Sequence, residues 1–98
     1  MLRYLSVGQL VKSVAGRDKN RWMIVVEVID DDYVLVADGK SRKIERPKKK
    51  KIKHLSKTNT IFEDISQEII QGTLTNHLIR KKIAAQSGED KGDEKSDI

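Results

Sequence analysis

Short apolar runs separated by polar turns make up the first half of the chain. The runs are Leu10–Val14, Trp22–Ile29 and Tyr33–Ala37. Runs of this length that are rich in Val and Ile are typical of β-strands. The second run is apolar at consecutive positions, so we expect a strand that is buried on both faces. The pattern therefore predicts three strands.

Turn signals divide these runs and predict two further strands. Asp30-Asp31-Asp32 breaks the second run, and Asp38-Gly39 is a strong hairpin signal because both residues tolerate positive φ. A fourth strand is expected at Arg42–Glu45, where Pro47 limits it to an edge or an end. A fifth is expected at Ile52–Leu55. Five short strands with tight turns favour a small curled barrel.

The hydrophobic period changes after residue 58. Isoleucine recurs every four residues from Ile61 to Ile69, which predicts a helix. Thr60 and Glu63 have the spacing of a capping box, and Gly72 provides a stop.

A second helix is expected directly afterwards. Thr75 is placed to cap it, and Leu74 and Ile79 have the spacing of a hydrophobic staple. The apolar sides of the two helices either cover the barrel or dock on another protein.

The predicted fold class is mainly β: a small SH3-like five-stranded barrel, two short C-terminal helices and a disordered tail. The expected boundaries are 1–57 for the barrel, 58–86 for the helical extension and 87–98 for the tail. The tail prediction rests on SGEDKGDEKSDI, which has one apolar residue.

Composition narrows the function classes. The chain has no cysteine, so a disulfide framework, a thiolate metal site and a cysteine nucleophile are excluded. No stretch approaches the roughly 18 apolar residues of a membrane span, and the N-terminus lacks a signal-peptide core. We expect a cytoplasmic monomer with no membrane partner, no cofactor and no metal.

Charge divides unevenly between the halves of the chain. Residues 1–57 hold 15 lysines and arginines against 7 acidic residues, whereas residues 58–98 carry a net charge of −3. A basic front half indicates a polyanion as partner.

The segment GRDKNR, residues 16–21, lies between the first two predicted strands. Gly16 and Asn20 tolerate left-handed backbone, so the loop can turn tightly. We expect its backbone N–H groups and the cations Arg17, Lys19 and Arg21 to point outward together, an arrangement that suits phosphate oxygens. The alternative is a hairpin turn with solvated charges.

The segment VGQLVKSVAGRDKNRWMIVV resembles a KOW motif, the strand-loop-strand element of several ribosomal proteins and NusG-type transcription factors. With VLVADG and the following lysines it is similar to small bacterial KOW-domain proteins, which are related to archaeal and eukaryotic large-subunit ribosomal proteins. The resemblance covers Val7 to Leu55 and implies an SH3-like barrel that binds RNA. Two glycines usual in the motif are Asn20 and Met23 here. Because Asn tolerates positive φ, we expect a left-handed Asn20.

A second basic cluster spans residues 40–57, with ten lysines and arginines against one acid, Glu45. We expect these residues to line one barrel edge and attract an RNA backbone. The alternatives are lysines that protect an edge strand from pairing, and, for PKKKKIK, a nuclear-localisation signal.

Trp22 follows the GRDKN loop and has two interpretations. It can stack on an unpaired base, or it can cover the end of the core, which is the commoner role of a lone Trp at a strand start.

The resulting hypothesis is a non-enzymatic protein that binds ribosomal or other structured RNA, with ribosomal proteins as possible further partners. The predicted RNA-binding residues are Lys12, Gly16, Arg17, Lys19, Asn20, Arg21, Trp22, Lys40, Arg42, Lys43, Arg46, Lys48, Lys49, Lys50, Lys51 and Lys53. The alternative is a module that docks on a ribosomal or transcription component. No nucleophile–base set or metal-ligand spacing supports an enzyme.

Overall fold

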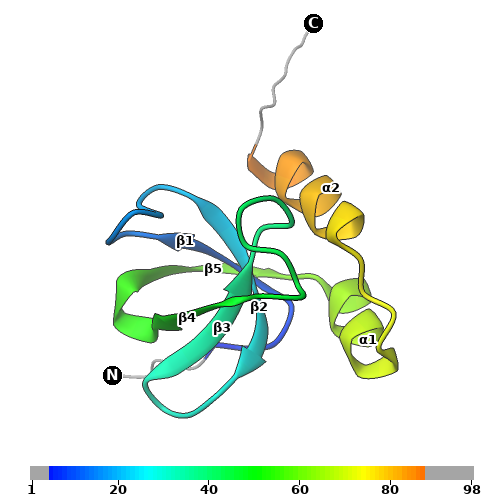
Figure 1. The fold of residues 1–98 in the computed structure, drawn as a ribbon, viewed down its shortest axis with the longest axis horizontal. Helices are drawn as coiled ribbons and strands as arrows, with labels where there is room; N and C mark the ends of the chain where they lie inside the picture. Colours follow the sequence, from blue (N-terminus) through cyan, green and yellow to red (C-terminus); the bar gives the residue numbers. More distant parts are fainter. Residues whose placement is uncertain (1–4, 88–98) are drawn as a thin grey trace, which may run out of the picture.

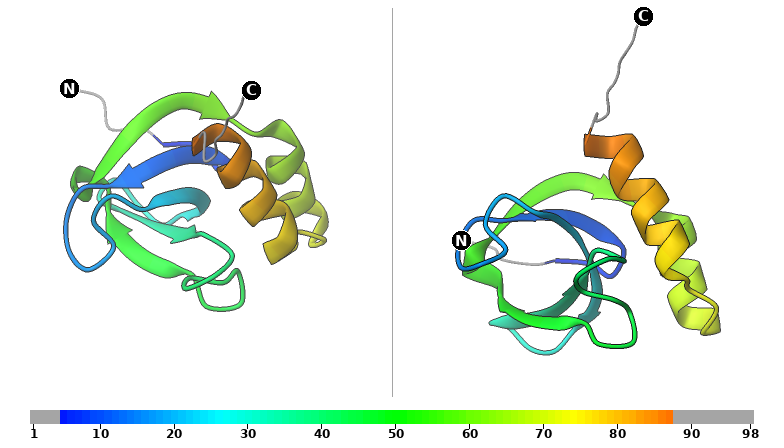
Figure 2. Two further views of the ribbon diagram at one scale, coloured as in Figure 1. Left: turned by 90° about the horizontal axis from the view of Figure 1, so that it is seen from above. Right: turned by 45° about the horizontal axis from the view of Figure 1, so that its top comes forward.

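The computed structural model describes residues 5–87 as one antiparallel five-stranded sheet and two helices (Figure 1). The strand order is β4-β3-β2-β1-β5. The elements are β1 (Gln9–Ser13), β2 (Trp22–Val28), β3 (Tyr33–Ala37), β4 (Lys48–Lys51), the 3-10 turn η1 (Ile52–His54), β5 (Leu55–Ile61), α1 (Glu63–Gln71) and α2 (Asn76–Ser87). The strands curl into a small barrel, and both helices lie along one side of it (Figure 2). The predicted fold class is confirmed.

Irregularities in strand pairing accompany the curl of the sheet. The register between β2 and β3 shifts between Val25 and Glu27, and that between β1 and β5 shifts between Gln9 and Val11. Bulges of this kind bend a strand and increase its twist, which lets a short sheet close on itself.

The two strands predicted last are wrong in position. Arg42–Glu45 forms no strand, because the Arg42 N–H donates to the Asp38 carboxylate and the Ile44 N–H donates to Asn76. The lysine run itself forms β4 and pairs with β3. Pairing with a neighbour thus overrides the weak β-propensity of lysine.

The predicted fifth strand is displaced toward the C-terminus in the same way. Residues 52–54 form η1, which buries Ile52 in the barrel, and β5 then runs from Leu55 to Ile61. The barrel therefore extends past the expected boundary at residue 57.

Two apolar clusters occupy the two faces of the sheet. The barrel interior contains Leu5, Val11, Met23, Val25, Val34, Val36 and Ile52. The outer cluster joins Leu10, Ile24 and Ala37 of the strands to Ile65 of α1 and Ile79 of α2. Successive side chains of a strand point to opposite faces, so β2 supplies both clusters. The predicted burial on both sides is confirmed for Met23–Val25, whereas Val28 and Ile29 at the end of the predicted run are exposed.

The helices cover the outer face of the barrel. Ile65 and Ile79 are fully buried, so this part of each helix's apolar side packs on the sheet and is not available to dock on another protein. Gly72 ends α1 with φ 73°, as predicted, and the Thr75 hydroxyl accepts a hydrogen bond from Leu78 N–H at the start of α2. The predicted capping box is wrong, because Thr60 lies in β5 and Phe62 precedes α1 without a side-chain cap.

The predicted tail lies almost entirely outside the described residues. Ser87, its first residue, belongs to α2, and residues 88–98 are not described. Within residues 5–87, no helix is both long enough and apolar enough to span a bilayer.

Candidate nucleic-acid interface

The first loop, residues 14–21 between β1 and β2, is a rigid turn. Gly16 and Asn20 have φ of 79° and 73°, so the predicted left-handed Asn20 is confirmed. The N–H groups of Lys19, Asn20 and Arg21 donate to Gly16 O at 3.2 Å, Ser13 O at 2.7 Å and Asp18 O at 2.9 Å. The expectation that the loop turns its backbone N–H groups outward is therefore wrong for these three residues, which use them to close the turn.

The loop's cations divide into free and engaged side chains. Arg17 and Lys19 are exposed, and no ion pair or hydrogen bond holds either side chain within residues 5–87. Arg21 Nη1 instead donates to Ser41 Oγ at 2.8 Å and to Asp38 Oδ2 at 3.4 Å. Arg17 and Lys19 are the members of this loop that a phosphate can reach without displacing a partner.

The second loop, residues 38–47 between β3 and β4, is organised by Asp38. Its Oδ1 accepts hydrogen bonds at 2.8 Å from Lys40 N–H and from Arg42 N–H. The turn predicted at Asp38-Gly39 is present, with Gly39 at φ 80°. It opens into a loop because the chain after it is bound to Asp38 and to α2.

Helix α2 holds the second loop in place. Arg80 Nη1 donates to Gly39 O at 2.7 Å, and Asn76 bridges Ile44 N–H and Glu45 Oε1, each at 2.9 Å. The hydrogen bond from Asn76 lowers the pKa of Glu45. A Cβ on Gly39 would lie 2.6 Å from Asn76 O, so only glycine fits this contact.

Asp18 connects the two loops through charge. Its carboxylate belongs to the first loop, is 5% exposed, and lies 3.7 Å from Arg42 Nη2 and 3.6 Å from Lys48 Nζ. Arg21 of the first loop pairs in turn with Asp38 of the second. Each loop thus contributes one aspartate that pairs with an arginine of the other. Neither aspartate was among the predicted site residues, although the Asp38-Gly39 turn signal pointed to one of them.

The lysines of β4 alternate between the two faces of the strand. Lys50 is 6% exposed, and its Nζ donates to Ala15 O at 2.9 Å, which fastens the first loop to β4. Lys49 is exposed, with its Nζ 4.6 Å from the centroid of the Tyr33 ring, and Lys51 is also exposed. The period of two along a strand therefore divides four identical residues into structural and accessible ones.

The cluster at 40–57 does not lie on one edge. It occupies the second loop, the edge strand β4, η1 and, with Lys57, the opposite edge strand β5. The predicted site cations that are both exposed and unpaired within residues 5–87 are Arg17, Lys19, Lys40, Lys43, Arg46, Lys51 and Lys53. Across residues 5–87, no group of three or more His, Cys, Asp or Glu side chains could hold a metal ion.

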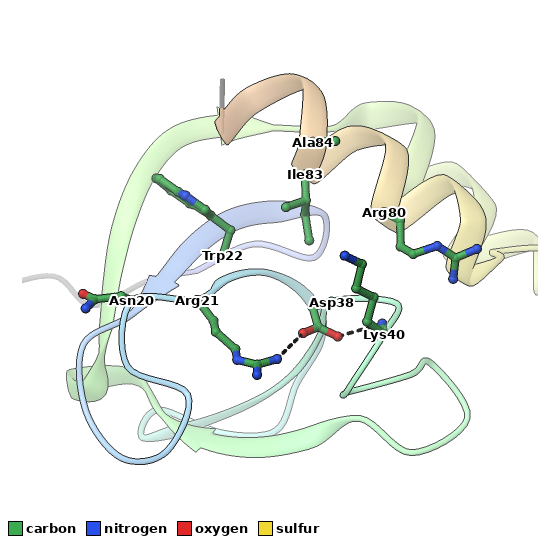
Figure 3. Close-up of a pocket in the computed structure, with 8 residues that line it drawn as sticks. All are labelled: Asn20, Arg21, Trp22, Asp38, Lys40, Arg80, Ile83 and Ala84. Carbon is green, nitrogen blue, oxygen red and sulfur yellow. Dashed lines mark hydrogen bonds and ion pairs between the residues drawn. The ribbon is translucent and has the colours of Figure 1, made fainter. Parts of the chain in front are cut away.

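Trp22 lies where the first loop enters β2. It is half-buried and packs against the outer cluster, as expected of a residue that covers a core, and Lys12 Nζ lies 5.2 Å from its ring centroid. Trp22 also lines a groove of about 390 Å³ between the two loops and α2 (Figure 3).

The fold and these loops define a small β-barrel protein that presents cations from two braced loops. The chain is 30% identical over 83 residues to the large ribosomal subunit protein eL14 of Desulfurococcus amylolyticus. This match covers 76% of this chain and 86% of that protein. It is 29% identical over 85 residues to eL14 of Pyrobaculum arsenaticum, covering 87% and 78%. For eL14 of Pyrobaculum calidifontis the identity is 32% over 63 residues, covering 64% and 61%. No protein-family model matches the chain.

The chain therefore belongs to the eL14 family of large ribosomal subunit proteins. This supports the predicted relation to archaeal large-subunit ribosomal proteins. The bacterial subgroup and the KOW motif named with that resemblance stay predictions.

Proposed function

We propose that this protein is a non-enzymatic RNA-binding component of the large ribosomal subunit, working in the cytoplasm through a KOW-type loop. It holds structured RNA, ribosomal RNA above all, by contacts to backbone phosphates. Membership of the eL14 family supports the ribosomal part of the proposal. Ribosomal proteins that pack beside it on the subunit are its further partners, and it joins them as a monomer.

The observation that carries the RNA contact is the pair of free cations at the tip of the first loop. Among residues 5–87, Arg17 and Lys19 are exposed and have no side-chain partner, while the loop backbone beneath them is closed by its own hydrogen bonds. The backbone positions of these two residues are therefore set before RNA binds, so binding has to order only their side chains and not the loop. Arginine can bind a phosphate through two N–H groups, and lysine acts as a point charge.

The second loop supplies further charge beside this tip. Lys40, Lys43 and Arg46 are exposed, and the Asp18 and Asp38 ion pairs hold their loop against the first. Lys50 is not part of the proposed interface because its ammonium group already donates a hydrogen bond to Ala15 O. Arg42 and Lys48 contact RNA only when their ion pairs with Asp18 are broken.

A binding experiment with matched charge changes tests the proposal. Arg17→Ala/Lys19→Ala removes two loop cations, and Lys57→Ala/Lys81→Ala removes two exposed cations from β5 and α2. Binding to a ribosomal RNA hairpin at low salt should weaken about tenfold more for the loop variant, at roughly 0.5–1 kcal/mol per contact. Equal losses for both variants would show that only net charge matters and would overturn the loop assignment.

One observation favours a second candidate, a module that docks on a ribosomal or transcription component. Ile70 on α1 is 76% exposed, although Ile65 and Ile69 of the same helix pack on the barrel. Ile70→Gln should leave RNA binding unchanged. If the variant loses attachment to ribosomal subunits while binding the hairpin normally, the docking function is supported instead.

A further inference from the structure

The groove between the two loops and α2 differs from the rest of the cationic surface because it has apolar walls. Trp22, Ile83 and Ala84 line it together with Arg21, Lys40 and Arg80. Figure 3 shows Trp22 at one end, Arg80 at the other, and Ile83 and Lys40 extending toward each other across it. At about 390 Å³, its volume is within the range of small-ligand pockets, about 300–1,000 Å³.

The rim of the groove is positive. Three cations face a single carboxylate, Asp38, whose oxygens already accept hydrogen bonds from Arg21, Lys40 N–H and Arg42 N–H. Asp38 thus has little capacity left to hold a cationic ligand. Apolar walls with a cationic rim fit a flat, uncharged ring that is attached to a phosphate.

The walls are held in place before any ligand binds. Gly39 lies against α2, and Arg80 donates to Gly39 O, so the helix and the second loop keep a fixed spacing. Trp22 is anchored by its packing in the outer cluster. The flexible Lys12 side chain covers one face of the indole, with Nζ 5.2 Å from the centroid, and it can move from the ring to a phosphate.

We propose that this groove receives one unpaired nucleobase of the bound RNA, which stacks between the Trp22 indole and the Ile83–Ala84 wall. Lys12 and Lys40 contact the phosphates that flank the base, while Arg80 holds the second loop against α2. The inference rests on the proposed RNA binding and adds to it a preference for RNA with an unstacked nucleotide. Stacking on an aromatic side chain tolerates any base, so the preference concerns RNA shape more than sequence.

Three hairpin RNAs with the same stem test this inference: one with a single bulged nucleotide, one with an abasic residue at the bulge, and one fully paired. Trp22 is the only tryptophan of the chain, so its fluorescence reports stacking directly. The bulged RNA should quench Trp22 and bind about 5- to 150-fold more tightly than the abasic one, the range expected for one stacked base. The abasic and paired RNAs should bind through phosphates without that quenching.

Two adjacent alanines of α2 give matched variants. Ala84 lines the groove and Ala85 does not, and both are exposed. Ala84→Glu should abolish the preference for the bulged RNA, whereas Ala85→Glu, which adds the same charge, should keep it. Trp22→Phe should keep most of the preference and Trp22→Leu should lose it, and thermal melts establish that each variant is folded.

The outcomes separate the inference from the proposed function. If all three RNAs bind equally and quench Trp22 equally, the base site is overturned while phosphate binding stands. If no RNA binds at low salt, the proposed function fails and the inference fails with it. If an acidic peptide containing Phe quenches Trp22 and no RNA does, the groove is a protein site and the inference is wrong.

Discussion

The first and second loops lie side by side, and each contributes one aspartate that pairs with an arginine of the other. Asp38 accepts two backbone N–H groups of its own loop at 2.8 Å in addition to its ion pair with Arg21. Asp18 has ion pairs at 3.6 and 3.7 Å, and its buried Oδ2 accepts no hydrogen bond from the part of the chain that the structure describes. Asp38 therefore shapes its own loop, whereas Asp18 acts through charge between the loops.

The two loops also differ in what surrounds their glycines. Gly16 of the first loop has only the tip of Lys50 within 4 Å of an added Cβ, whereas Gly39 of the second meets the backbone of α2. The first loop is held by its own hydrogen bonds and by polar side-chain contacts to Lys50 and Arg42, and its tip faces solvent. The second loop is packed between the sheet and α2, so adding a side chain at its glycine should lower the free energy of unfolding more than the same change in the first loop.

The largest expected effect comes from the two glycines. Gly39→Ala combines left-handed strain with a clash against Asn76 O, so the free energy of unfolding should fall by about 2–4 kcal/mol. Gly16→Ala adds only the strain, about 1–2 kcal/mol. Urea titrations of both variants measure this difference, and equal losses would contradict the clamping of the second loop by α2.

Asparagine and alanine substitutions separate the roles of the two aspartates. Asp38→Ala leaves two N–H groups unpaired and should cost about 1–3 kcal/mol, while Asp38→Asn keeps an acceptor and should cost much less. Asp18→Asn and Asp18→Ala should cost about the same, roughly 1–2 kcal/mol, because Arg42 and Lys48 are one-third exposed and recover part of their hydration. Chemical denaturation tests this, and rescue of Asp18 by Asn would show that its charge is unimportant.

The left-handed residue of the first loop gives a smaller effect. Asn20→Val should lower the free energy of unfolding by about 1–2 kcal/mol because a β-branched residue resists φ 73°. Asn20→Gly, which introduces a residue that tolerates positive φ without strain, should be close to neutral. A stable Val variant with unchanged RNA affinity would show that the turn is less constrained than its geometry implies.

The smallest effect concerns an ion pair outside the loops. Lys82 Nζ lies 2.6 Å from Asp64 Oδ2, and this contact lowers the pKa of Asp64. A lowered pKa stabilises the fold above the ordinary Asp value of about 3.9, and the stabilisation is lost as pH falls through the lowered value. Because the carboxylate is 48% exposed, Asp64→Asn should cost only about 0–1 kcal/mol at neutral pH. The stability difference between Asp64→Asn and wild type should shrink below about pH 3.9 in thermal melts. A difference that does not change with pH would contradict a stabilising ion pair between Asp64 and Lys82.

Local patterns predicted what depends on nearest neighbours. The three central strands, the stop at Gly72, the Thr75 cap and the left-handed Asn20 all follow from residue types and short spacings. The doubly apolar β2 correctly indicated that something covers the outer face of the sheet.

Contacts between distant segments decided what the sequence did not predict. Residues 42–45 carry a strand-like pattern, but Asp38 and Asn76 engage their backbone first. Lys50 is identical in type to Lys49 and Lys51, and only the register of β4 against β3 buries it. Asp18 and Arg80 gave no local signal, because their partners lie in other loops.

The salt dependence of RNA binding tests the central claim most directly. Affinity for a ribosomal RNA hairpin is measured from about 50 to 200 mM salt for the wild type and for Arg17→Ala/Lys19→Ala. With five to eight phosphates engaged, the slope of log binding constant against log salt concentration should be roughly −4 to −7 for the wild type. For the variant, the slope should be smaller in magnitude by about 2. A wild-type slope near zero, or the same slope for both proteins, would contradict the account.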